Sequence, residues 1–176
     1  MVIATNLGFP RIGAKRELKK ALESYWKGEI SADALAETGK VLRKMNWELQ
    51  KNTGLHHIPS NDFSYYDLTL DTIAMVGAVP ARYQFKGGKV DLDTYFAMAR
   101  GAQGGSDHAH HEGCTHGALD VSAMEITKWF DTNYHYLVPE FEANQNFTLS
   151  STKAVDEFNE AKALGITTRP VLLGPV

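Results

Sequence analysis

A cluster of positive charge follows a glycine- and proline-containing corner near the N-terminus. The corner spans residues 8–13, and the cations Arg16, Lys19 and Lys20 follow it. Apolar residues recur after it at helical spacing and predict one buried helix face: Leu18, Ala21, Leu22 and Tyr25. The start of a helix already carries partial positive charge and unpaired backbone N–H groups. Because additional cations there repel one another unless an anion binds, the cluster indicates an anion site.

The same cluster has an interpretation that needs no ligand. Lys19 and Glu23 are one helical turn apart and can form a surface ion pair, which makes Lys20 one of several solvated charges on an exposed face. Composition alone favours this second interpretation. The two differ in one consequence, because only an anion site predicts ligand binding that weakens as salt rises.

A second group of chemically active side chains lies between Gly101 and Gly117, in a segment rich in glycine and histidine. Its candidate metal ligands are His108, His110, His111, Cys114 and His116. Imidazole and thiolate are preferred zinc ligands, but this spacing matches no recognised zinc pattern and the glycines leave the ligands without a rigid frame. We therefore expect a flexible surface loop with weak, adventitious affinity for zinc, nickel or copper.

Polar residues follow a predicted strand at residues 56–59. The two adjacent histidines in that strand point to opposite faces, so they cannot chelate one metal together, and we expect one to be partly buried and one exposed. Asn61 and Asp62 come just after the strand, which is where active-site residues gather in barrel proteins. Asp62 or Ser64 is also placed to cap the next helix, and we expect capping to be the main role.

The bulk composition excludes several classes of protein. Hydrophobic residues make up 43% and charged residues 22% of the 176 positions, as is typical of a globular domain. A net charge of -3 argues against a nucleic-acid-binding protein. No apolar run approaches the ~20 residues of a membrane span, and no signal peptide is evident. The single cysteine excludes an internal disulfide and is consistent with a cytoplasmic location.

Strand and helix patterns alternate along the whole chain. Helices are predicted around residues 16–27, 31–54, 65–76, 91–99, 122–130 and 152–164. Ser31 is expected to cap the second of these helices, and Asp91 or Asp93 the fourth. Trp47, in the second helix, is expected to serve packing. Strands are predicted around residues 2–7, 56–59, 133–138, 147–149 and 169–173. Ser122 and Glu125 form a capping-box pattern, which places Lys128 on a helix. Because the connections are long enough for crossovers, this alternation predicts a parallel α/β fold.

Five stretches along the chain carry a family resemblance. They are Leu-Gly-Phe-Pro-Arg-Ile-Gly at 7–13 with the helix that follows, Pro-Ser-Asn-Asp-Phe at 59–63, Val-Pro-Ala-Arg-Tyr at 79–83, Thr-Lys-Trp-Phe-Asp-Thr-Asn-Tyr-His-Tyr at 127–136 and Arg-Pro-Val-Leu-Leu-Gly-Pro-Val at 169–176. In this order they resemble the start of the cobalamin-independent methionine synthase family, the 5-methyltetrahydropteroyltriglutamate–homocysteine methyltransferases. The resemblance covers essentially the whole chain except the loop at 101–118.

The resemblance implies a fold. Family members consist of two large (β/α)8 barrels, so residues 1–176 are expected to form the first part, about half, of the N-terminal TIM-type barrel. The rest of that barrel and the zinc-bearing C-terminal barrel would then be absent from this fragment. An incomplete barrel leaves strand edges unpaired, and we expect such a fragment to self-associate through them.

The resemblance also implies an activity for the full-length protein. The family transfers a methyl group from 5-methyltetrahydropteroyltri-L-glutamate to L-homocysteine and so forms L-methionine. It uses no cobalamin, and zinc in the C-terminal barrel holds the homocysteine sulfur as a nucleophilic thiolate. Because neither catalytic residues nor zinc ligands are expected in this fragment, we predict that it is inactive alone. No nucleic acid or membrane partner is expected.

Five residues match the family's binding positions for the methylated folate: Arg16, Glu17, Leu18, Lys19 and Lys128. They are expected to contact the polyglutamate tail, whose carboxylates are natural partners of lysine and arginine. Leu18 lies on the predicted buried face, so it would contribute only through its backbone. Glu17 would either orient Arg16 or contact the pteroyl group. The alternatives are a structural half-barrel without a ligand, or weak metal binding by the histidine-rich loop.

Overall fold

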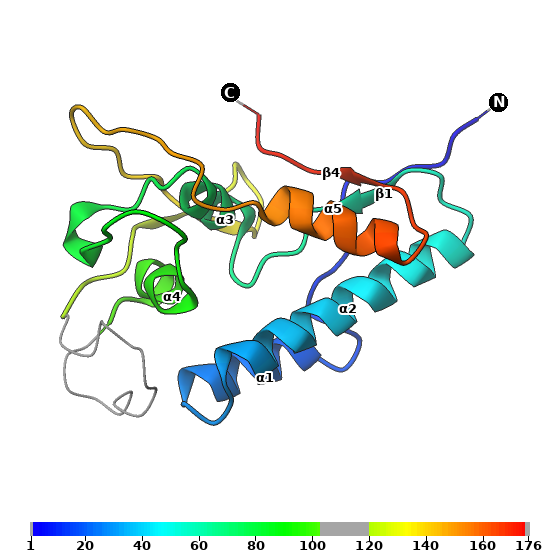
Figure 1. The fold of residues 1–176 in the computed structure, drawn as a ribbon, viewed down its shortest axis with the longest axis horizontal. Helices are drawn as coiled ribbons and strands as arrows, with labels where there is room; N and C mark the ends of the chain where they lie inside the picture. The colour runs from blue at the N-terminus through cyan, green and yellow to red at the C-terminus, as the bar shows by residue number, and fades with distance from the viewer. Residues whose placement is uncertain (1, 103–119, 175–176) are drawn as a thin grey trace. The chain divides into compact units, whose positions relative to one another are not determined.

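The computed structural model describes residues 2–102 and 120–174 (Figure 1). These residues form two compact units. The first unit combines Met1–Tyr65 with Thr152–Val176, and the second unit is Tyr66–Ser151. The first unit therefore contains both ends of the chain.

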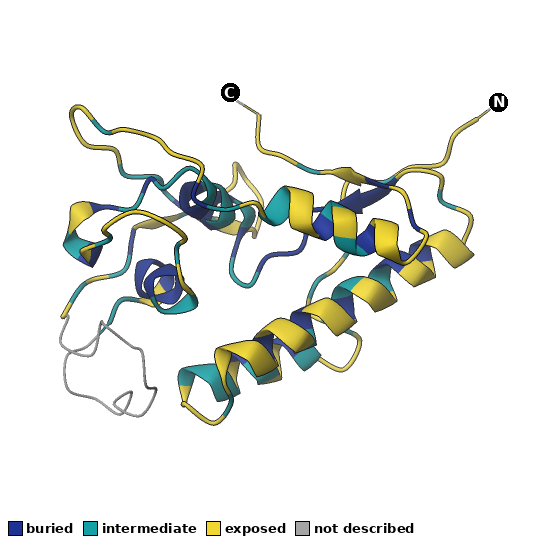
Figure 2. Ribbon diagram, in the orientation of Figure 1, coloured by how far each residue is buried: buried dark blue, intermediate teal, exposed yellow. Residues whose placement is uncertain are grey.

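The first unit contains three helices: α1 (Glu17–Trp26), α2 (Ala32–Asn52) and α5 (Lys153–Ala163). The predicted cap of α2 is confirmed, because the Ser31 hydroxyl accepts a hydrogen bond from the Ala34 N–H at 3.2 Å. Each helix turns one buried stripe inward and exposes its opposite side (Figure 2). The long amphipathic pattern of residues 31–54 therefore gives the helix that was predicted.

A parallel strand pair lies beside these helices. Strand β1 (Ile58–Ser60) pairs with β4 (Thr168–Pro170) in a register that places Ile58 opposite Thr168. The strand predicted around residues 2–7 was wrong, because this segment forms only an isolated parallel bridge, between Thr5 and His57, on the β1 side of the pair. Parallel strands need a crossover connection between them. The parallel β1–β4 pair, together with the helices, confirms the predicted α/β class and the parallel sheet. Half of an eight-stranded barrel remains a prediction, because the described strands form two two-stranded sheets.

The core of the first unit includes a cluster around Trp47. Trp47 is 2% exposed and packs with Ile58, Ala161 and Ile166. Its indole N–H donates to the Pro59 carbonyl at 3.0 Å, so its one polar atom is satisfied inside the core. Trp47 was predicted to serve packing, and the structure confirms this.

The second unit carries α3 (Leu68–Met75), the 3-10 turn η1 (Ala81–Tyr83), α4 (Leu92–Arg100), β2 (Ile126–Lys128) and β3 (His135–Leu137). Strands β2 and β3 form an antiparallel hairpin with Ile126 opposite Leu137. Of the two expected caps of α4, Asp91 holds the position and Asp93 does not, since the Asp91 carboxylate accepts from the Thr94 N–H at 2.7 Å.

The helix predicted at residues 122–130 was wrong. The capping-box pattern is local, whereas the backbone of this segment bonds to more distant residues. The Val138 N–H donates to the Glu125 carbonyl at 2.8 Å, and the Met124 N–H donates to the Met98 carbonyl at 2.8 Å. Lys128 therefore lies on strand β2, and the strands of the second unit are antiparallel rather than parallel.

Three smaller predictions also need correction. Helix α3 is capped by Asp67 rather than Asp62 or Ser64, and the Asp67 carboxylate accepts from the Leu70 N–H at 2.9 Å. Residues 147–149 form no strand, although the Thr148 N–H donates to the Val76 carbonyl and the Ser150 N–H to the Met75 carbonyl, at the end of α3. His56 and His57 are both exposed. Among the described residues, no helix combines the length and apolar character needed to cross a bilayer.

Candidate functional site

The predicted anion site begins with a corner that hydrogen bonds close onto helix α1. The Arg16 N–H donates to the Gly13 carbonyl, and the Leu18 N–H donates to the Ile12 carbonyl, both at 3.1 Å. Arg16 occupies the N-cap position in a left-handed conformation, with φ 62° and ψ 37°. Such a conformation is strained for a residue with a side chain and needs support from its surroundings. The corner therefore presents Arg16 in one defined backbone geometry.

Arg16 and Lys19 are both exposed at the start of α1, where the sequence analysis placed them. Lys19 also forms the ion pair of the ligand-free interpretation, with its ammonium 3.5 Å from the Glu23 carboxylate. These two side chains are 47% and 49% exposed, so solvent screens the pair and its stabilisation is small. Lys19 can therefore exchange Glu23 for an anionic ligand at little cost.

Asp62 fixes the corner to strand β1. Its carboxylate accepts a hydrogen bond from the Phe9 N–H at 2.8 Å, and a Cβ on Gly8 would lie 3.6 Å from the same oxygen. Asn6, just before the corner, is attached to helix α2, because its side-chain amide donates to Gln50 Oε1 at 2.9 Å. Burial raises the pKa of Asp62, while the Phe9 N–H opposes that rise. Asp62 therefore holds the corner instead of capping a helix.

A buried polar network lies just before Asp62. Asn61 has a positive φ of 58°, and its N–H donates to the Glu157 carboxylate at 2.9 Å. Its side-chain amide donates to the Val171 carbonyl at 2.7 Å and accepts from the Lys153 ammonium at 2.9 Å. These bonds connect the residues after β1 to those after β4. Burial is the main cause of the raised pKa of Glu157.

Leu18 and Glu17 are less exposed than Arg16 and Lys19. The Leu18 side chain is fully buried, which confirms its place on the buried face of α1. Glu17 is half-buried, and its carboxylate accepts from the Lys15 N–H at 2.9 Å. Glu17 therefore turns back toward the corner.

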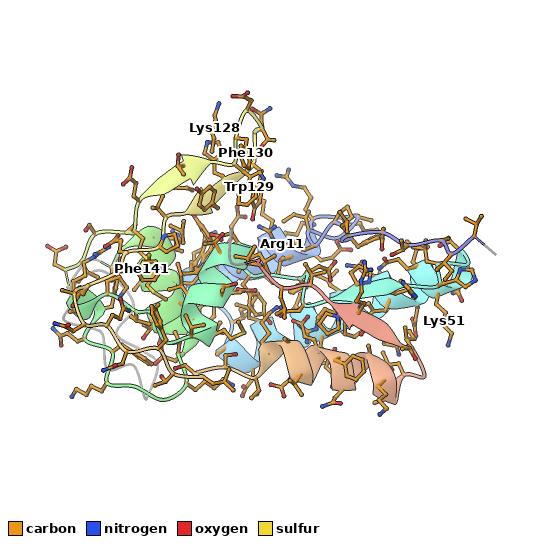
Figure 3. The ribbon with its side chains drawn as sticks, turned by 90° about the horizontal axis from the view of Figure 1, so that it is seen from above. Arg11, Lys51, Lys128, Trp129, Phe130 and Phe141 are labelled. Atoms are coloured by element: carbon orange, nitrogen blue, oxygen red, sulfur yellow. The ribbon has the colours of Figure 1, made fainter. Side chains whose placement is uncertain are left out.

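Lys128 is exposed at the end of β2, in the second unit. It lies beside Trp129 and Phe130 at the hairpin's loop end (Figure 3). Phe130 is 81% exposed and has a positive φ of 50°. The other four predicted residues lie together at the start of helix α1 in the first unit, whereas Lys128 belongs to the second unit.

The whole chain has a family match. It corresponds to the family described as "Cobalamin-independent synthase, N-terminal domain" over residues 3–176. The chain belongs to this family. The resemblance carried by the five sequence stretches is thereby confirmed, including the absence of cobalamin that the family's name states.

Curated relatives of this cobalamin-independent synthase domain are much longer proteins. The protein of Salinibacter ruber is 57% identical over 176 residues, which is 100% of this chain and 22% of that protein. The protein of Caulobacter vibrioides is 62% identical over 178 aligned positions, covering 99% of this chain and 23% of that protein. Both are named 5-methyltetrahydropteroyltriglutamate–homocysteine methyltransferase. The chain thus spans less than a quarter of their length.

Zinc does not fit the part of this synthase domain that the structure describes. Within residues 2–102 and 120–174, no group of three or more histidine, cysteine, aspartate or glutamate side chains could hold a metal ion. The candidate ligands at residues 108–116 lie outside the described residues.

Proposed function

We propose that this chain is the methyl-donor-binding N-terminal part of a 5-methyltetrahydropteroyltriglutamate–homocysteine methyltransferase. In this proposal the whole enzyme moves the methyl group to L-homocysteine and forms L-methionine. The chain itself recognises the polyglutamate tail of the folate and does not activate the homocysteine thiol. One observation carries the proposal: Arg16 and Lys19 stand exposed at the start of α1, on a corner with a defined backbone.

The chemistry of the tail suits this arrangement. A triglutamate presents several carboxylates in a row, and charge-assisted hydrogen bonds from arginine and lysine are their strongest partners. The helix dipole adds partial positive charge at the same end of α1. Within the corner, Arg16 offers a planar guanidinium that can bind one carboxylate through two N–H groups. Lys19 is a point charge one turn further along the helix, and Lys128 is proposed as an additional contact.

The expected affinity is modest because the cations are exposed. An exposed ion pair contributes about 0.2–1 kcal/mol, so each lysine or arginine changes the affinity only a few-fold. Charges in solvent are screened over about 8–10 Å near physiological ionic strength. Recognition of the tail should therefore weaken steadily as salt is added, while contacts to the uncharged part of the folate should not.

Replacing Lys19 with glutamine should lower the affinity for pteroyltriglutamate by about two- to fivefold at low salt. The matched control is Lys44→Gln, because Lys44 pairs with Glu48 one turn away at 3.9 Å and is similarly exposed, but lies on α2. Titration calorimetry of both variants measures the difference. If Lys44→Gln lowers the affinity as much as Lys19→Gln, net charge rather than a site explains binding, and the proposal fails.

A further inference from the structure

The negative charge of Glu17 is unexpected in a site proposed to bind carboxylates. It lies between Arg16 and Lys19 at the start of α1, where a carboxylate would repel the carboxylates of a polyglutamate tail. Its favourable interaction with the helix dipole accounts for its stability there but not for any role in binding. The contacts of its side chain give a different explanation.

The Glu17 carboxylate closes the corner from within. Its Oε2 accepts the Lys15 N–H at 2.9 Å. The two backbone bonds from Arg16 to Gly13 and from Leu18 to Ile12 close the same few residues. The carboxylate thus satisfies a backbone donor that precedes the helix.

Gly13 provides the space that this carboxylate occupies. A Cβ at Gly13 would overlap Glu17 Oε2 and would come within 3.0 Å of Leu42 Cδ2. Gly13 also has φ +83°, which residues with side chains rarely adopt. The glycine, the glutamate and the left-handed Arg16 therefore form one interdependent corner.

We propose that Glu17 is a positioning residue for the polyglutamate site: it holds residues 13–17, at the end of the corner, in the geometry that presents Arg16 and does not itself contact the ligand. This inference rests on the proposed function, because it concerns the same site. A strained backbone position that its neighbours over-determine is common where a protein prepares a binding group in advance. The cost of ordering Arg16 is then met during folding instead of during binding.

Charge and positioning predict opposite results for Glu17→Ala. If Glu17 acts only through its charge, its removal strengthens binding of pteroyltriglutamate. If it positions Arg16, its removal weakens binding by about threefold or more, because a hydrogen bond from a backbone N–H to a charged group is lost. Glu17→Gln keeps an oxygen acceptor for the Lys15 N–H and should bind at least as tightly as the unaltered chain.

Two matched controls complete the test. Glu23→Ala removes an exposed carboxylate from the same helix and should not weaken binding. Gly13→Ala should weaken binding, whereas Gly28→Ala should not, because Gly28 has φ +73° but a Cβ there meets nothing within 4 Å. All variants are titrated calorimetrically with pteroyltriglutamate, and their melting temperatures are measured by circular dichroism to compare folding.

The outcomes distinguish the positioning role of Glu17 from the proposed binding of the tail by Arg16 and Lys19. If Glu17→Ala binds as tightly as the unaltered chain or more tightly, while Arg16→Ala still weakens binding, Glu17 has no positioning role and the tail site stands. If Arg16→Ala and Lys19→Gln are both without effect, the proposed function itself is wrong. Weakening by Glu17→Ala and Gly13→Ala, with rescue in Glu17→Gln, supports the inference.

Discussion

Replacing Glu157 with alanine will lower the free energy of unfolding by about 3–5 kcal/mol, the usual cost of breaking a buried charge pair. Glu157 is 4% exposed, and its carboxylate lies 3.1 Å from the Lys153 ammonium and 4.0 Å from the Arg43 guanidinium. It also accepts the Asn61 N–H. Removing it leaves that N–H buried without its acceptor and takes away the negative charge shared by two cations.

Urea unfolding followed by circular dichroism measures this loss. Glu48→Ala is the control, because Glu48 forms an exposed pair with Lys44 and its loss should change stability by less than about 0.5 kcal/mol. Breaking a buried pair should cost about 3 kcal/mol or more. If the free energies of unfolding of Glu157→Ala and the unaltered chain differ by less than about 1 kcal/mol, the network after β1 is not a main stabilising feature.

Replacing Trp47 with alanine will destabilise the chain by about 3–5 kcal/mol, as large-to-small changes in a packed core do. The substitution removes the packing against Ile58, Ala161 and Ile166, and it deprives the Pro59 carbonyl of its donor. Trp47→Phe retains part of the ring volume but loses the hydrogen bond, so its effect should be smaller.

Trp129→Ala provides the comparison for Trp47. Trp129 is 43% exposed, so its truncation should have much less effect on the melting temperature. Equal loss of stability in the two tryptophan variants would show that burial of Trp47 does not carry the stability of the first unit.

The features predictable from the sequence are those with local causes. Ser31 and Asp91 cap the helices that follow them through bonds to residues three positions away. Ser31 was predicted, and Asp91 was one of two predicted candidates. The charge cluster at Arg16 and Lys19 was also visible, because helix periodicity places these residues at the start of α1. Short-range geometry of this kind depends little on the rest of the chain.

The features that sequence analysis missed have distant causes. Residues 122–130 carry a local capping pattern, but pairing with β3, which places Thr127 opposite Tyr136, makes residues 126–128 a strand. Met45 and Leu49 fit a helical repeat but are each 52% exposed, because the partners of α2 pack against a neighbouring face. Asp62 lies 53 positions from Phe9, so no pattern within either segment indicates their hydrogen bond.

Glu17 illustrates the limit of charge patterns. The resemblance left two roles open for it, orienting Arg16 or contacting the pteroyl group, and the sequence contains nothing that separates them. The bond to the Lys15 N–H and the space at Gly13 depend on the backbone path of the corner. Only the three-dimensional structure supplies that path, and it supports the orienting role.

Titration calorimetry of the chain with pteroyltriglutamate and with pteroylmonoglutamate tests tail recognition most directly. The two ligands share the pteroyl group and differ only in the number of tail carboxylates. We expect the triglutamate to bind more tightly at low salt, with an advantage that shrinks as ionic strength rises toward physiological values. Equal affinities for the two ligands at low salt, or an advantage that salt leaves unchanged, would contradict a cationic tail site at Arg16 and Lys19.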